Sequence, residues 1–287
     1  MRWRRGRGRE EIEDRRGQGV GGLGRGGAGI PIPVGGGIGG LLIAVLLVVL
    51  FSTGVLGGGS GGPSGGSGQL AGAPDPDAKL VDFIGFVVDD VQGWWQKDFT
   101  QSGRTYQVTK LVLFDDQTES GCGLASSETG PFYCPVDRKV YLDLGFFREL
   151  RDRLQAPGDF AEAYVIAHEF GHHVQTLLGI EGRVQEERQS HPSEANDLSV
   201  RLELQADCYA GVWAHSAYEQ NLLESGDLEE ALTAAAAVGD DRIQRSAGRR
   251  VNPETWTHGS SAQRVQWLKT GFQSGDPGSC DTFSGSI

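Results

Sequence analysis

An uncharged apolar run divides the chain into two unlike parts. Residues 38–56 read IGGLLIAVLLVVLFSTGVL, which is 19 residues without a charged side chain. About 20 apolar residues are enough to cross a bilayer as a helix. We therefore predict one transmembrane anchor within residues 30–56. A buried core helix is the alternative, but the Gly/Ser-rich residues 57–73 have the composition of a linker and favour an anchor.

Charge and glycine content change at the same boundary. Residues 1–25 carry eight arginines and four acidic residues, whereas the rest of the chain carries 18 Lys and Arg against 34 Asp and Glu. We expect residues 1–29 to be a disordered basic segment on the cytoplasmic side, because arginines precede the apolar run and none follows it directly. A cleaved signal peptide is the alternative. The acidic remainder argues against a nucleic-acid partner.

Residues 74–287 are long enough for one well-buried domain, which this topology places outside the cytoplasm. Apolar periodicity and capping residues predict a mainly helical α+β domain with a small sheet. Residues 106–114, which are rich in Val, Leu and Thr, predict a strand, and the alternating residues 139–144 predict another. Helices are predicted at residues 77–99, 146–154, 159–178, 194–216, 227–239 and 261–272.

Four cysteines fit a body exposed to an oxidising compartment. They are Cys122, Cys134, Cys208 and Cys280, and an even number permits three pairings. We favour Cys122–Cys134, which closes a short loop, and hence Cys208–Cys280. A zinc site built from these cysteines and free buried thiols are the alternatives.

Three of the six histidines fall within six residues of one apolar helix. His168 and His172 are four residues apart, so both imidazoles stand on one face and can reach one metal ion. Glu169 lies beside the first histidine, where it can take a proton from a metal-bound water. This is the His-Glu-x-x-His pattern of zinc proteases. Gly171 within the helix suggests a closely packed neighbour, and His173 is a candidate hydrogen-bond partner of Glu169.

A second helix offers the remaining ligand. Glu203 and Asp207 are again four residues apart, and catalytic zinc usually has three protein ligands. We interpret Glu203 as the third ligand, with Asp207 holding a ligand histidine by its other ring nitrogen. The reverse assignment of these two residues is the alternative, and so is a solvated acidic face.

Six segments spread over nearly the whole chain carry a resemblance: MRWRRGRGREEIEDRRG, GPFYCP, KVYLDLGFF, AHEFGHHVQ, ELQADCYAGVWAH and THGSSAQRVQWLKTGF. Together they resemble the neutral zinc metallopeptidase family of bacterial membrane-anchored proteins. The resemblance covers nearly the whole chain and implies a zincin-like α+β fold, Zn²⁺ as cofactor, and peptide or protein substrates. It also implies His168, His172 and Glu203 as ligands and Glu169 as general base.

Three further expectations concern the surroundings of the site. His258 stands before a helix cap, from which it could stabilise an oxyanion. Arg264 could pair with an acidic residue near the zinc. Residues 139–144 are a candidate edge strand for binding a substrate in the extended conformation. The sequence thus predicts a membrane-anchored, extracytoplasmic zinc endopeptidase. A zinc-stabilised envelope scaffold without catalysis is the alternative.

Overall fold

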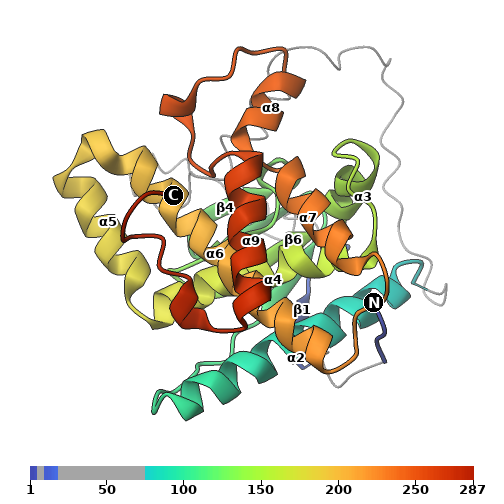
Figure 1. The fold of residues 1–287 in the computed structure, drawn as a ribbon. Helices are drawn as coiled ribbons and strands as arrows, with labels where there is room; N and C mark the ends of the chain where they lie inside the picture. The colour runs from blue at the N-terminus through green and yellow to red at the C-terminus, as the bar shows by residue number, and fades with distance from the viewer. Residues whose placement is uncertain (5–9, 19–74) are drawn as a thin grey trace, which may run out of the picture.

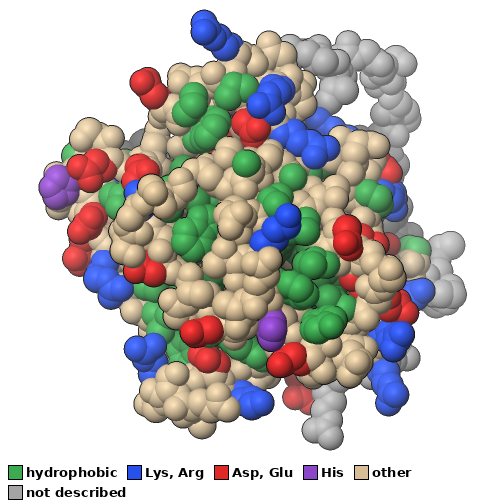
Figure 2. Space-filling model, in the orientation of Figure 1, with side chains coloured by type: hydrophobic (Ala, Val, Ile, Leu, Met, Phe, Trp, Pro, Cys, Tyr) green, Lys and Arg blue, Asp and Glu red, His purple; other side chains and the backbone are tan. Residues whose placement is uncertain are grey.

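The computed structural model describes residues 1–4, 10–18 and 75–287 (Figure 1). These residues form an α+β fold that is mostly helical and carries two small sheets. Figure 2 shows acidic and basic side chains interspersed over the face that carries α9, with apolar side chains between them. The anchor predicted in residues 30–56 and the linker at 57–73 lie outside the described residues. Among those that are described, no helix has the length and apolar character needed to cross a bilayer.

The predicted helices are confirmed, with ends moved by a few residues. Two more that the sequence analysis did not identify, α5 and α8, are rich in charged and polar side chains and lack a long apolar stripe. The α-helices of the described residues are α2 (Ala78–Gln101), α3 (Gly145–Asp152), α4 (Asp159–Leu177), α5 (Ile180–Ser190), α6 (Ala195–Glu219), α7 (Asp227–Ala237), α8 (Asp240–Ser246) and α9 (Ser261–Ser274).

The larger sheet has the strand order β1-β2-β6-β5. Strands β1, β2 and β6 run parallel, and β5 pairs antiparallel with β6. The strands are β1 (Ile12–Asp14), β2 (Leu111–Phe114), β5 (Phe132–Cys134) and β6 (Lys139–Asp143). The expectation that residues 139–144 form a sheet edge is wrong, because β6 lies between β2 and β5. Only the last part of the strand predicted at 106–114 is a strand.

The N-terminal segment belongs to the folded body. Residues 12–14 pair with β2, and the amino group of Met1 lies 2.8 Å from Oδ1 of Asp159, the first residue of α4. The expectation of a separate disordered segment over residues 1–29 is therefore wrong for the described part of it. A single crossing by residues 30–56 would separate β1 from β2.

A hairpin is attached to the sheet by a disulfide. Strands β3 (Gln117–Ser120) and β4 (Gly123–Ser126) pair antiparallel, and Cys122 in their turn is bonded to Cys134 at the end of β5. The second disulfide joins Cys208 on α6 to Cys280 in the C-terminal segment. Both disulfides form in the favoured pairing.

The core lies where α4 passes between the sheet and the other helices. Helix α4 contacts α2, α6 and α7 on its sides and β5 and β6 of the sheet, and α9 crosses α6 near the centre of Figure 1. Nearly every residue of α4 from Phe160 onward is buried, including His168 and Glu169. A charged motif on so buried a helix needs partners from neighbouring elements.

Candidate metal centre

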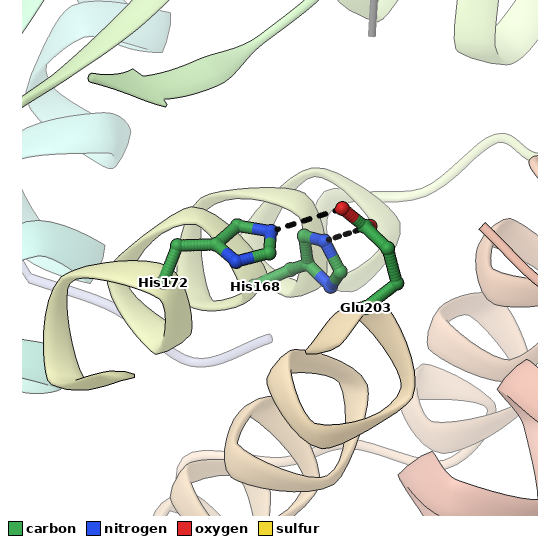
Figure 3. A group of neighbouring side chains, drawn as sticks. All are labelled: His168, His172 and Glu203. Carbon is green, nitrogen blue, oxygen red and sulfur yellow. Dashed lines mark ion pairs between the residues drawn. The ribbon is translucent and has the colours of Figure 1, made fainter. Parts of the chain in front are cut away.

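Three metal-donor side chains converge from two helices. His168 and His172 lie one turn apart on α4, and Glu203 faces them from α6 (Figure 3). Nε2 of His168 lies 3.2 Å from Oε2 of Glu203, and Nε2 of His172 lies 3.6 Å from Oε1 of the same carboxylate. The three donor atoms lie within 4.8 Å of one another. One ion can therefore reach all three side chains.

The two helices approach closely at Gly171, between the two histidines. A Cβ atom at this position would lie 3.1 Å from both Cα and the carbonyl oxygen of Ala206 on α6. The neighbour expected from the sequence is thus the backbone of α6. Because Ala206 is less than one turn from Glu203, the close contact also sets the distance between the histidines and the carboxylate.

Asp207 holds the ring of His168 from behind. Its Oδ1 accepts hydrogen bonds from Nδ1 of His168 at 2.9 Å and from the hydroxyl of Tyr164 at 2.5 Å. Arg264 donates to both carboxylate oxygens, at 2.9 and 3.0 Å, as expected of an arginine paired with an acid near the site. An ionised carboxylate only accepts, so the proton sits on Nδ1 and Nε2 stays available for a metal. This geometry fits an orienting residue.

Burial and neighbouring charges shift the pKa values of these groups. Burial opposes ionisation of Asp207, but Arg264 and His168 outweigh it and lower the pKa of that carboxyl. Burial also opposes the charged form of His168, yet Asp207 and Glu203 raise its pKa to about 10. Burial opposes ionisation of Glu203, but its interactions with His172 and His168 outweigh burial and lower the pKa of that carboxyl.

Glu169 is buried without full hydrogen bonding. Its Oε2 atom has no partner among the described residues, although the side chain lines the same cavity as His168 and Glu203. Burial raises the pKa of this carboxyl. A raised pKa suits a group that must accept and return a proton near neutral pH.

His258 is held by Asp240, a partner that the sequence analysis missed. Nδ1 of His258 lies 3.3 Å from Oδ1 of Asp240, and the backbone N–H of His258 donates to Oδ2 at 2.7 Å. Nε2 is buried and has no partner among the described residues. The ring lines the cavity together with Glu169 and Glu203. No spacing in the sequence pointed to Asp240, because the rest of α8 and a loop without periodicity separate it from His258.

Apolar side chains form much of the remaining wall of this cavity. Such a wall beside polar donors is typical of sites that bind an organic substrate. The apolar residues are Pro131, Phe146, Leu154, Val165, Val238 and Ile243. They come from the segment before β5, from α3 and the loop after it, and from α4, α8 and the end of α7.

His173 takes part in packing instead of contacting Glu169. Its Nε2 donates to the carbonyl oxygen of Gln107 at 2.6 Å, and its Nδ1 lies 3.1 Å from the hydroxyl of Tyr133. Burial lowers the pKa of His173 to about 4. The ring is therefore neutral at physiological pH and joins α4 to the sheet side of the molecule.

Comparison with known proteins places the chain in a family. The family model described as "Putative neutral zinc metallopeptidase" matches residues 1–283. The uncharacterized protein YpfJ of Escherichia coli K12 is 46% identical over 289 residues, which cover 100% of both chains. The uncharacterized protein Mb2605 of Mycobacterium bovis is 53% identical over 190 residues, covering 62% of this chain and 64% of that protein. No solved structure matches.

The match extends over nearly all of the chain and includes the helices that carry the three donor side chains. It implies zinc as the cofactor and peptides or proteins as substrates. With His168, His172 and Glu203 brought together as a His-Glu-x-x-His site requires, the chain belongs to the neutral zinc metallopeptidase family.

Proposed function

We propose that this chain is a zinc-dependent endopeptidase in which Glu169 is the general base. The observation that carries the proposal is that two of the three buried polar side-chain atoms without partners among the described residues lie at one cavity. These two are Oε2 of Glu169 and Nε2 of His258, and both side chains line the cavity that His168 and Glu203 also line; the third atom is Oγ of Ser216. A purely structural metal site needs neither group, whereas peptide hydrolysis uses both a base and an oxyanion donor.

The donor set suits zinc. Two imidazoles and one carboxylate are ligands found in catalytic zinc sites, where a further position stays open. His168 and His172 present their Nε2 atoms toward Glu203, and the Nδ1 atom of each ring is engaged elsewhere. When bound, zinc supplies a Lewis acid that lowers the pKa of water toward ~7 and polarises a carbonyl.

The chain's own residues then have separate roles. Glu169 takes a proton from the attacking water and delivers it to the leaving amine. His258 donates a hydrogen bond from Nε2 to the carbonyl oxygen as negative charge develops there, and Asp240 and Thr257 hold the ring at Nδ1. Asp207 and Arg264 keep His168 in the tautomer that leaves Nε2 free.

Replacement of Glu169 by glutamine tests the role of the base. Glu169→Gln preserves the shape of the side chain but cannot accept the proton. Zinc per chain should stay equal to that of the wild type, while hydrolysis of a peptide substrate should fall by roughly 10²–10⁴-fold. Retained full activity would rule out Glu169 as the base. Loss of zinc in this variant would instead make Glu169 part of the metal site.

Replacement of His258 provides an independent measurement on the same cavity. His258→Ala should also keep its zinc and should lose on the order of 10²–10³-fold in kcat. If only KM changes, the ring binds substrate without stabilising the developing charge.

We further propose that the body is zincin-like and lies outside the cytoplasm. The helix with both histidines packs beside a mixed sheet, and two disulfides are typical of an oxidising compartment. The β1–β2 pairing supports placing residues 10–18 in the same compartment as the body. A membrane anchor in residues 30–56 remains a prediction for residues that the structure does not describe, and a single crossing there would separate β1 from the strand with which it pairs.

A further inference from the structure

Three hydrogen bonds connect the ring of His172 to the C-terminal segment of the chain. Nδ1 of His172 lies 2.8 Å from Oε1 of Gln175. The side-chain amide of Gln175 donates to Oε1 of Gln205 at 3.2 Å, and the amide of Gln205 donates to the carbonyl oxygen of Cys280 at 2.9 Å. Both glutamines are buried, Gln175 completely.

The direction of this chain is fixed by backbone carbonyls. A carbonyl oxygen can only accept, so the NH₂ group of Gln205 must face Cys280 and its oxygen must face Gln175. The NH₂ group of Gln175 is fixed in the same way, because it also donates to the carbonyl of Leu202 at 2.7 Å. The oxygen of Gln175 is therefore the atom that remains for His172.

The consequence for His172 is a defined tautomer. Because Oε1 of Gln175 accepts, the proton of the neutral ring must lie on Nδ1. Nε2 then carries the lone pair, and this is the nitrogen that faces Glu203 at 3.6 Å. Asp207 fixes the same tautomer in His168, but it does so with a charge. For His172 two uncharged amides produce the same result.

We propose that Gln175 and Gln205 are positioning residues that select the metal-binding tautomer of His172. The carbonyl oxygens of Leu202 and Cys280 set their orientation. The inference rests on the proposed metal site and assigns the residues that orient one of its ligands.

The Cys208–Cys280 disulfide holds the end of this chain in place. Cys208 follows Asp207 on α6, so the disulfide links the C-terminal segment to the turns that carry Glu203 and Gln205. The carbonyl of Cys280 is thereby kept within reach of the amide of Gln205.

Methionine substitutions test the proposal with a matched control. Methionine is close to glutamine in length but cannot make these hydrogen bonds. Gln175→Met removes the direct partner of His172, and Gln205→Met removes the next amide while leaving the first in place. Gln92 on α2 is buried to the same extent as Gln205, and its side-chain amide bonds the backbone of Thr109. Gln92→Met therefore reports the cost of losing a buried amide outside the metal site.

For each full-length variant we would measure zinc affinity by competition with a chelator, and stability by urea unfolding of the zinc-free protein. Gln175→Met should bind zinc about 10–100-fold more weakly than the wild type, as expected on loss of a partner of a ligand histidine. Gln205→Met should show a smaller loss, and Gln92→Met should keep wild-type affinity. Gln175→Glu, which retains an acceptor for Nδ1, should bind zinc better than Gln175→Met.

The tautomer itself can be observed by nitrogen NMR of the neutral histidine rings in the zinc-free protein. His172 should carry its proton on Nδ1 in the wild type and populate both tautomers in Gln175→Met. Unchanged zinc affinity in Gln175→Met, or an equal loss in Gln92→Met, would overturn the inference while leaving the metal site intact. A wild type that binds no zinc would overturn the metal site itself. If Gln175→Met does not fold, Gln205→Met decides by the same two measurements.

Discussion

At the scale of single residues, polar groups around the metal donors differ in how fully they are paired. Asp207 accepts bonds from His168, Tyr164 and Arg264, whereas one atom each of Glu169 and His258 has no partner among the described residues. Leaving a buried polar group unpaired costs about 1–3 kcal/mol. The fold thus gives up stability at the two positions that we assign to chemistry.

Glu162 makes stability depend on pH at a site apart from the metal donors. Burial raises the pKa of this carboxyl to about 7, with Asp159 and Glu230 contributing and Arg151 opposing. The folded state therefore binds more protons than the unfolded state between the usual pKa of a glutamate and pH 7. Stability should fall as the pH rises through that window, by up to about 3 kcal/mol.

Urea unfolding at pH 5 and pH 8 checks this dependence. Glu162→Gln cannot ionise. Its free energy of unfolding, compared with that of the wild type, should therefore be higher at pH 8 than at pH 5. The difference between wild type and variant should be smallest at pH 5. A difference that is the same at both pH values would contradict the assignment of the raised pKa.

Some residues of the site can be predicted from sequence because helical spacing fixes a face. His168, His172 and Glu203 are of this kind. Asp240 could not be predicted, because its approach to His258 depends on a loop without periodicity. Gln175 could not be predicted either, because an uncharged amide on a buried helix looks like any other core residue. Its role depends on which carbonyls of α6 face it.

At the scale of elements, the site depends on how closely α4 and α6 pack. Gly171 is the point of contact, and a side chain there would meet the backbone of Ala206. Backbone within a helix cannot move aside as a flexible side chain does, so a Cβ atom at this position should push the helices apart.

Gly171→Ala should therefore lower the free energy of unfolding by about 1–3 kcal/mol, although alanine is the better helix former. It should also weaken zinc binding, because His168 and His172 would move relative to Glu203.

Gly93 on α2 is the control, because a Cβ atom there has no neighbour within 4 Å. Gly93→Ala should raise the free energy of unfolding by up to about 1 kcal/mol. Equal effects of the two substitutions in urea unfolding would refute the packing argument.

The sequence predicts the long amphipathic or apolar helices, but it does not predict the short polar helices or the order of the strands. The apolar residues of α2 and of the first turns of α4 recur with a clear helical period. Helix α5 is mostly polar, and α8 is only seven residues long, so neither has a periodic signal. The position of β6 inside the sheet depends on its pairing with β2 as well as with the neighbouring β5, and β2 is separated from β6 in sequence by the β3–β4 hairpin.

At the scale of the whole molecule, the body is assembled from two distant parts of the chain. The N–H of Leu111 donates to the carbonyl of Glu11, and the N–H of Arg15 donates to the carbonyl of Leu113. Lys139 on β6 also lies 2.6 Å from Glu13. The Arg/Gly-rich composition of residues 1–29 led to a prediction of disorder. Composition is an average over the whole segment, so it does not reveal a strand as short as β1.

Removal of residues 1–18 should therefore expose β2 as a sheet edge. In hydrogen–deuterium exchange, the amide of Leu111 should be protected in the full chain and should exchange much faster in the truncated one. The amides at the centre of α6 provide an internal reference that should change less. Equal exchange at Leu111 in both proteins would show that β1 does not pair with β2 in solution.

The central claim is that His168, His172 and Glu203 bind the zinc that peptide hydrolysis requires. The most direct test measures zinc per chain and peptide hydrolysis on the same preparations of full-length wild type and Glu203→Ala, purified under oxidising conditions. We predict about one zinc per wild-type chain, with both zinc and hydrolysis lost or greatly weakened in the variant. Equal zinc and equal hydrolysis in the two proteins would contradict the assignment of Glu203. A zinc-loaded wild type that hydrolyses no peptide would contradict the proposed function.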